Sequence, residues 1–276
     1  MNKIDGFNIN CSKEDKVIIF KDGIFSIGEF EGTYEEAKEA ILKKYEGKEA
    51  EDYISKLDGA IDMKWFSDEV HKELKNDEDF RIRLVVTKYS DKYHNELKND
   101  EHWLVRVAVA GYSDKHHYEL KNDGDYYVRK AVAEFSDKYH EELKNDEDLN
   151  VRVAVAEYSD KYHYELSDDE EWEVRCAVAK FSDKYHDDLK DDKEYYVRVA
   201  VAEYSDKYHK TLKNDEDWIV RRAVAEFSDK YHEELKNDED WRVRRAVAQF
   251  SDKYHKELKN DNNPTIRKIV AQCSDK

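Results

Sequence analysis

A phrase of 23 residues is repeated without interruption through most of this chain, and this repetition restricts the possible folds more than any other feature. The nine copies begin at Ser67, Ser90, Ser113, Ser136, Ser159, Ser182, Ser205, Ser228 and Ser251. A fixed period of this size is typical of solenoids, because so short a unit cannot bury its apolar side chains alone and must pack on its neighbours. We therefore expect a repeat domain over residues 67–276, preceded by a separate module over residues 1–66.

Apolar residues inside each unit recur at helical spacing. In the eighth copy, Val243, Ala246, Val247 and Phe250 lie at i, i+3, i+4 and i+7, which is one stripe along a helix. A shorter stripe with the same spacing begins at the first residue of the unit. Each unit is therefore predicted to form two short helices, the first of them short enough to be a 3₁₀ turn.

Residues that favour helix ends stand at fixed places in the unit. Serine at unit position 1 and aspartate at position 13 are good N-caps for the first and second helix. In the ninth unit Asn263 takes the second cap, and Pro264 follows it at the site that proline favours. The aromatic residue at position 23 precedes the serine, where a hydrophobic staple is expected.

The first 66 residues follow a different pattern. The segment KVIIFKDGIFSIGEF, from Lys16 to Phe30, predicts a β-hairpin that turns at Lys21-Asp22-Gly23. TYEEAKEAILKKY follows and opens with the capping box Thr33…Glu36, so a helix is expected there. With a second predicted helix over residues 48–57, the module is interpreted as a small ββαα unit of unknown role.

Charge and cysteine usage narrow the range of partners and compartments. The formal net charge is −18, so a nucleic-acid backbone or an anionic membrane is a poor default partner. Cys11, Cys176 and Cys273 are far apart and form no CxxC motif, which fits a reducing compartment. The sequence shows no signal peptide and no apolar run of the roughly 18 residues that a membrane span needs. We therefore expect a cytoplasmic protein without a membrane segment.

Unit position 5 is a histidine in every copy, which raises the question of metal binding. Stacked helical units lie about 8–10 Å apart, whereas zinc holds its ligands at about 2 Å. Histidines of neighbouring units therefore cannot share an ion, and an interior, hydrogen-bonded role is expected for them. The NDED segments lack the glycine and the bidentate glutamate of a calcium loop. We find no phosphate-binding loop, nucleophile elbow or HExxH motif, so neither a cofactor nor an enzymatic activity is predicted.

Position 17 is an arginine and position 11 an aspartate in all nine units. A row of arginines could follow phosphates, but a fixed base matched by a fixed acid is more simply an internal ladder within or between units. The predicted ladder comprises Arg106, Arg129, Arg152, Arg175, Arg198, Arg221 and Arg244 with Asp100, Asp123, Asp146, Asp169, Asp192, Asp215 and Asp238. Nucleic-acid binding through these arginines is the weakest of the functions considered.

Positions that vary between units are free to serve a partner. Positions 15, 18 and 22 share one face of the second helix, and positions 15 and 18 are apolar or aromatic in the middle of the array and basic toward its C-terminal end. This pattern predicts a binding groove, with partial burial between neighbouring helices as the alternative. The predicted partner-binding residues are Leu104, Val107, Tyr127, Lys130, Val153, Tyr196, Val199, Ile219, Arg222, Arg242 and Arg245.

The recurring motif Val243-Arg244-x-Ala246-Val247-Ala248, preceded by aspartate, resembles that of the leucine-rich repeat variant family and, more loosely, short HEAT-like repeats. The form Pro264-Thr265-Ile266-Arg267 in the last unit is closest to the family's pattern. The resemblance covers residues 67–273 and implies a right-handed α-superhelix that binds rather than catalyses. Some members carry an N-terminal cysteine cluster for an iron–sulfur centre, but only Cys11 stands there, so no such cofactor is expected.

The leading hypothesis is thus a non-catalytic α-solenoid that binds a protein in a concave groove, and the acidic surface favours a partner with a basic surface. The alternative is an acidic nucleic-acid mimic that inhibits a nucleic-acid-binding enzyme, as phages and mobile elements encode. The two differ in the expected effect of salt, which weakens a mimic far more than a groove binder.

Overall fold

The computed structural model describes residues 7–11, 16–21, 24–27, 30–32, 39, 43 and 68–274. The chain divides into two compact units, Met1–His116 and His117–Lys276, and each is described by itself. These two are the first unit and the second unit; every other numbered unit is a 23-residue repeat. The predicted boundary at residues 66/67 remains a prediction.

The N-terminal part of the first unit contains a four-stranded antiparallel sheet in the order β1-β2-β3-β4. Its strands are β1 (Phe7–Cys11), β2 (Lys16–Lys21), β3 (Ile24–Ile27) and β4 (Phe30–Gly32). The predicted hairpin corresponds to β2 and β3, in which Lys21 lies opposite Ile24. The prediction of only two strands is wrong, because β1 and β4 extend the hairpin on both sides. A lone hairpin is only marginally stable in water, and the added strands stabilise it. The two predicted helices lie outside the described residues, apart from Glu39 and Lys43.

The repeats follow as pairs of helical elements in both units. The first unit contains α3 (Asp68–Leu74), α4 (Phe80–Tyr89), η2 (Asp91–Tyr93), α5 (His94–Leu97), α6 (Trp103–Tyr112) and η3 (Asp114–His116). The second unit contains α7 (His117–Leu120), α8 (Tyr126–Phe135), η4 (Asp137–Tyr139), α9 (His140–Leu143), α10 (Leu149–Tyr158), η5 (Asp160–Tyr162), α11 (His163–Leu166), α12 (Trp172–Phe181), η6 (Asp183–Tyr185), α13 (His186–Leu189), α14 (Tyr195–Tyr204), η7 (Asp206–Tyr208), α15 (His209–Leu212), α16 (Trp218–Phe227), η8 (Asp229–Tyr231), α17 (His232–Leu235), α18 (Trp241–Phe250), η9 (Asp252–Tyr254), α19 (His255–Leu258) and α20 (Pro264–Ser274). The regular 23-residue helical repeat predicted from the sequence is confirmed.

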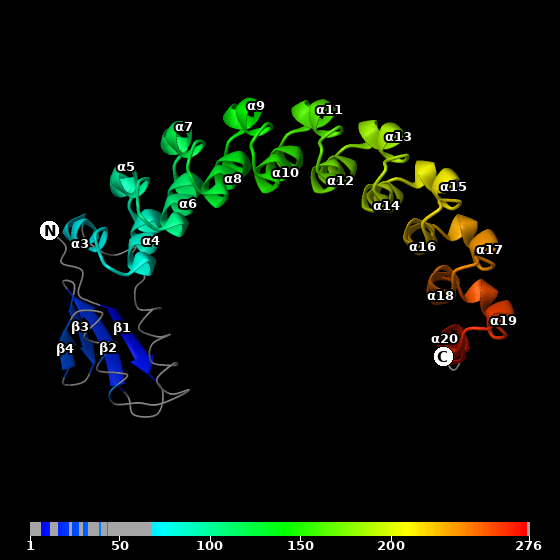
Figure 1. Ribbon diagram of the computed structural model, residues 1–276. Helices are drawn as coiled ribbons and strands as arrows, with labels where there is room; N and C mark the ends of the chain where they lie inside the picture. Colours follow the sequence, from blue (N-terminus) through cyan, green and yellow to red (C-terminus); the bar gives the residue numbers. More distant parts are fainter. Residues whose placement is uncertain are drawn as a thin grey trace. The chain divides into compact units, whose positions relative to one another are not determined.

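Within the second unit the long helices, which carry the even numbers from α8 to α20, form one row. The short helices, which carry the odd numbers from α7 to α19, form another (Figure 1). The core lies where these rows meet and where consecutive long helices pack on each other. Val151 and Val155 of α10, at unit positions 16 and 20, are fully buried, as are their counterparts in every described unit from α8 to α18. The apolar stripe predicted for the second helix therefore forms the core at these positions.

The helix ends show which capping predictions hold. The Asp148 carboxylate accepts a hydrogen bond from the Asn150 N–H (2.8 Å), and Asn263 accepts one from the Thr265 N–H (2.8 Å). Pro264 is the first residue of α20, as predicted. The predicted serine cap is wrong, because Ser159 makes no side-chain capping bond. Its N–H instead donates to the Val155 carbonyl (3.0 Å) and closes the preceding long helix.

The aromatic residue at position 23 does not form the predicted buried staple. Phe250 is 58% exposed, and Phe135, Tyr158, Phe181, Tyr204 and Phe227 are also exposed. The long helix ends at this residue and the following serine is extended (Ser159, φ −148°, ψ 110°), so the ring lies beyond the contact between neighbouring helices.

The histidines at position 5 lie inside the array and join the two rows of helices. Nε2 of His140, on the short helix α9, donates to the Ala133 carbonyl of the long helix α8 (2.7 Å). This bond therefore fixes a short helix to the long helix that precedes it. This bond places the proton on Nε2 and leaves Nδ1 as the bare nitrogen of the neutral ring. Nδ1 of His140 is buried without a hydrogen-bond partner, and the ring meets Tyr162 of the next unit edge-on.

Within each of the two compact units, a buried ion pair connects one 23-residue repeat to the next. In α12, Nε and Nη2 of Arg175 donate to the two carboxylate oxygens of Asp192 in the following unit (2.6 and 2.9 Å). Nη1 donates to the Asp169 carbonyl of its own unit (2.6 Å). The side chains of Arg175 and Asp192 are only 5% and 8% exposed. The hydrogen bond to Asp192 raises the pKa of Arg175, so the arginine is charged at any working pH.

The same geometry recurs along the array. In the second unit the pairs are Arg129–Asp146, Arg152–Asp169, Arg175–Asp192, Arg198–Asp215, Arg221–Asp238 and Arg244–Asp261. In the first unit Arg83 pairs with Asp100, and Nη1 of Arg106 donates to the Asp100 carbonyl (2.8 Å). Each aspartate also accepts the N–H two residues later, as Asp123 does from Asp125 (2.9 Å). One carboxylate thus holds both its own loop and the neighbouring unit.

We expect Arg175→Met to lower the free energy of unfolding by about 3–5 kcal/mol, because it leaves the buried Asp192 carboxylate without its partner. Arg245→Met is the matched control, since Arg245 is exposed, and it should change stability by about 0.5 kcal/mol or less. Urea denaturation followed by circular dichroism measures both. Equal effects of the two variants would contradict a structural role for the pair.

Acid should destabilise the array. Burial alone would raise the pKa of Asp261, but hydrogen bonds from Arg244 and the Asn263 N–H, with the arginine charge, lower it overall. A carboxylate with a lower pKa in the folded state stabilises fully above its unfolded pKa of about 3.9, and this contribution is lost as pH falls through the folded pKa. Stability in urea should therefore fall below about pH 4. Asp261→Asn should remove the share of this dependence that comes from its own pair, whereas the exposed Asp229→Asn should leave the dependence unchanged. An identical dependence in wild type and Asp261→Asn would refute the assignment.

Candidate binding surface

The predicted partner-binding residues all lie on the long helices. Leu104 and Val107 are on α6, in the first unit, and both are half-buried. In the second unit Tyr127 and Lys130 are on α8, Val153 on α10, Tyr196 and Val199 on α14, Ile219 and Arg222 on α16, and Arg242 and Arg245 on α18. Tyr127, Tyr196, Arg242 and Arg245 are exposed, and the others are half-buried. None of them is sealed in the core, and several also contact neighbouring helices.

Aromatic residues at unit position 14 belong to the same surface, and sequence reasoning missed them. Trp172 of α12 stacks on Tyr196 of the next long helix, with ring centroids 4.5 Å apart. The Arg242 guanidinium lies 4.3 Å from the centre of the Trp218 ring in the same way. The signal was present in the sequence, because position 14 is Phe, Trp or Tyr in seven of the nine units. We define the long-helix face as unit positions 14, 15 and 18.

The basic residues of this face are partly neutralised by their own helices. Lys130 pairs with Glu134 (3.3 Å) and Arg222 with Glu226 (3.1 Å), each four residues later. Such half-exposed pairs at the surface contribute little to stability. Arg242 of α18 likewise pairs with Asp240 (3.2 Å), so the charge at the basic end of the face is also partly neutralised.

The long-helix face offers no activated nucleophile in the described part of the chain. Burial raises the pKa of the Cys176 thiol to about 12, so this cysteine stays protonated at neutral pH. The hydrogen bond with Tyr196 raises the pKa of Tyr195 to about 12 as well. These side chains are suited to contact a ligand and not to exchange protons with it near pH 7.

The exposed aromatic residues at position 23 form a second surface, which we call the aromatic edge. Between Phe227 and Phe250 lies a pocket of about 510 Å³, which Asp206 and Asp229 also line. Position 23 is aromatic in eight of the nine units, and its exposure shows that a residue type that recurs in the array need not be buried between the helices.

Carboxylates of unit position 12 form a third regular feature. The side chains of Glu147, Glu216 and Glu239 are 89%, 90% and 87% exposed.

Among the described residues, no helix combines the length and apolar character that crossing a membrane requires.

Removal of a side chain from the long-helix face should leave the fold almost unchanged. Tyr196 is 46% exposed, so Tyr196→Ala should cost about 1 kcal/mol, the worth of its stacking on Trp172. Leu189→Ala, in the buried core of the same unit, should cost about 2–5 kcal/mol. Thermal and urea denaturation compare the two. Equal costs would place Tyr196 in the core and end its candidacy as a contact residue.

Comparisons with known proteins agree with the repeat geometry. No protein-family model and no curated protein matches the chain. A solved structure described as a leucine-rich repeat variant with a novel repetitive structural motif is similar, with a TM-score of 0.59 and 26% sequence identity. The similarity covers 71% of this chain and 87% of that one. The array of paired short and long helices is therefore a leucine-rich repeat variant-like solenoid, as the sequence motif predicted.

Proposed function

We propose that this protein is a non-catalytic scaffold that binds another protein along the long-helix face. A repeat fold of this kind suggests a binding scaffold, because stacked units present the same helix face many times. The observation that supports the proposal best is the row of half-exposed Trp, Tyr and Arg side chains stacked between successive long helices. These residue types carry most of the binding energy in protein interfaces.

The packing of the arginine pairs argues against nucleic acid as the partner. Arg152 is 7% exposed, and its Nε, Nη1 and Nη2 all donate within the array, to the Asp169 carboxylate and the Asp146 carbonyl, so its guanidinium is poorly placed to bind a phosphate. The surface instead presents carboxylates such as Glu147. Complementarity of charge therefore favours a protein partner with a basic surface.

The long helices also stand where a partner can reach several of them together. In the second unit they follow the inner side of the curve in Figure 1, with the short helices behind them. A partner of these helices would contact exposed aromatic side chains such as Tyr127 and Tyr196. Its basic residues would meet the glutamates at unit position 22 of α8, α10, α14 and α16.

The test uses the full chain and proteins that it retains from native cells, each then purified for affinity measurement. Tyr196→Ala should weaken binding by about 30-fold or more, which corresponds to the 2 kcal/mol of a hot-spot residue. Tyr164→Ala is the matched control, because Tyr164 is 74% exposed on the short helix α11, and it should leave affinity unchanged. Equal affinities of wild type and Tyr196→Ala would refute the proposed face.

A nucleic-acid mimic is the second candidate. The glutamates at unit position 12, which occur in six of the nine units, favour it, because they are spaced at multiples of the repeat like charges along a backbone. A mimic's affinity for a basic cleft should collapse with added salt and survive Tyr196→Ala. A partner of the long-helix face should show the opposite pattern. Titration of affinity against salt with both variants separates the two functions.

A further inference from the structure

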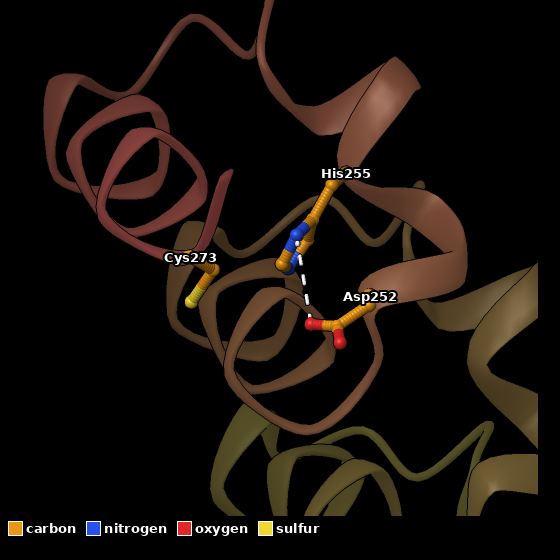
Figure 2. A group of neighbouring side chains, drawn as sticks. All are labelled: Asp252, His255 and Cys273. Carbon is orange, nitrogen blue, oxygen red and sulfur yellow. Dashed lines mark ion pairs between the residues drawn. The ribbon is translucent and has the colours of Figure 1, made fainter. Parts of the chain in front are cut away.

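The ninth unit carries a group of side chains that no other unit has. Position 23, aromatic in the other eight units, is Cys273 here. Figure 2 shows Cys273 on α20 beside Asp252 of η9 and His255 of α19. The thiol sulfur, a histidine nitrogen and a carboxylate oxygen lie within 4.8 Å of one another.

The histidine is oriented as a metal ligand. Nε2 of His255 donates to the Ala248 carbonyl (2.8 Å), which fixes the ring and leaves the lone pair of the neutral imidazole on Nδ1. Metal-binding histidines are commonly held by such a bond from the other ring nitrogen to a backbone carbonyl. Nδ1 faces the Asp252 carboxylate at 3.7 Å.

The preceding unit shows why the arrangement is specific to this place. Asp229 and His232 occupy the same unit positions as Asp252 and His255, but Phe250 stands in place of the cysteine. Nδ1 of His232 is buried, and its ring meets Tyr254 edge-on at 6.4 Å. The eighth unit therefore lacks the sulfur, and its histidine nitrogen is covered.

We propose that Asp252, His255 and Cys273 bind one Zn²⁺ ion. Sulfur, imidazole nitrogen and carboxylate oxygen are the ligands of zinc, whose bond lengths place them about 3.4–3.6 Å apart in a tetrahedron. The exposed Asp252 and Cys273 side chains reach this spacing by small rotations. Thiolate and carboxylate balance the charge of the ion, and water completes the fourth position.

The ion would add a direct link between the short and long helical elements of the ninth unit. It bridges η9 and α19 to the long helix α20, and so fastens the short and long helices of the ninth unit. This site is independent of the proposed long-helix face, since none of its three ligands belongs to positions 14, 15 or 18. Binding should therefore raise the unfolding temperature of the chain, because the ion binds only the folded arrangement.

Titration of the reduced full-length chain with Co²⁺, followed by displacement with Zn²⁺, tests the site. A bound thiolate gives Co²⁺ a charge-transfer band in the near ultraviolet, so the band should saturate at one ion per chain. Cys273→Ser should abolish the band, and Asp252→Asn should weaken Zn²⁺ affinity by at least tenfold. Both residues are exposed, and circular dichroism checks that the variants fold.

Two controls make the result specific. Asp229→Asn removes the equivalent carboxylate of the eighth unit, and Cys176→Ser removes a thiol elsewhere in the array; both should retain the band and the wild-type Zn²⁺ affinity. Cys273→Phe restores the aromatic residue of the other units and should remove metal binding. The proposal is overturned if wild type shows no thiolate band, if the band survives Cys273→Ser, or if Asp229→Asn weakens affinity as much as Asp252→Asn.

Discussion

The array depends on the buried bond between one unit's arginine and the next unit's aspartate. Apolar packing of valines and alanines attracts neighbouring long helices, but it has little directional preference. The bidentate pair, of which Arg175 and Asp192 are typical, permits a single geometry. A buried ion pair often adds little net stability over an apolar contact. Its contribution here is better understood as register, because a unit displaced along its neighbour would leave both charges buried and unpaired.

A second row of ion pairs acts at the short helices. Lys144 pairs with Glu165 of the next unit (3.0 Å), and Lys236 pairs with Glu257 (2.6 Å). These pairs have an exposed carboxylate and so contribute less than the buried arginines. Together the two rows of ion pairs hold consecutive units in place without using unit positions 14, 15 and 18 of the long helices. The stacked aromatic residues of the long-helix face, such as Trp172 and Tyr196, lie at these positions.

The exposed position-23 residues show a limit of reasoning from periodicity. Phe250 has the spacing of the buried stripe, yet it is exposed because the helix ends beneath it. Periodicity gives the direction of a side chain around a helix axis, but not where the neighbouring helix stops. Spacing also failed at Ser159, where the N–H closes the preceding long helix and the side chain makes no capping bond to the next element.

Sequence reasoning also treated the histidines as one class. It excluded an ion shared between neighbouring units by distance, and the proposed zinc site does not need one. The ligands of that site come from a single unit, and the long helix brings Cys273 back to His255 across 18 positions of sequence. Such a contact becomes visible only when the path of the chain between the two residues is known.

The sequence by itself determined the repeat, its period and its helical pairs, because these follow from local spacing, helix caps and the need of short units to stack. The arginine and aspartate that recur in every unit likewise predicted a pairing. Only the tertiary structure decided that the partner lies in the next unit, that position 14 joins the exposed face, and that one unit gathers three metal-binding side chains. These features depend on the distance between helices that are remote in sequence, and no local pattern encodes that distance.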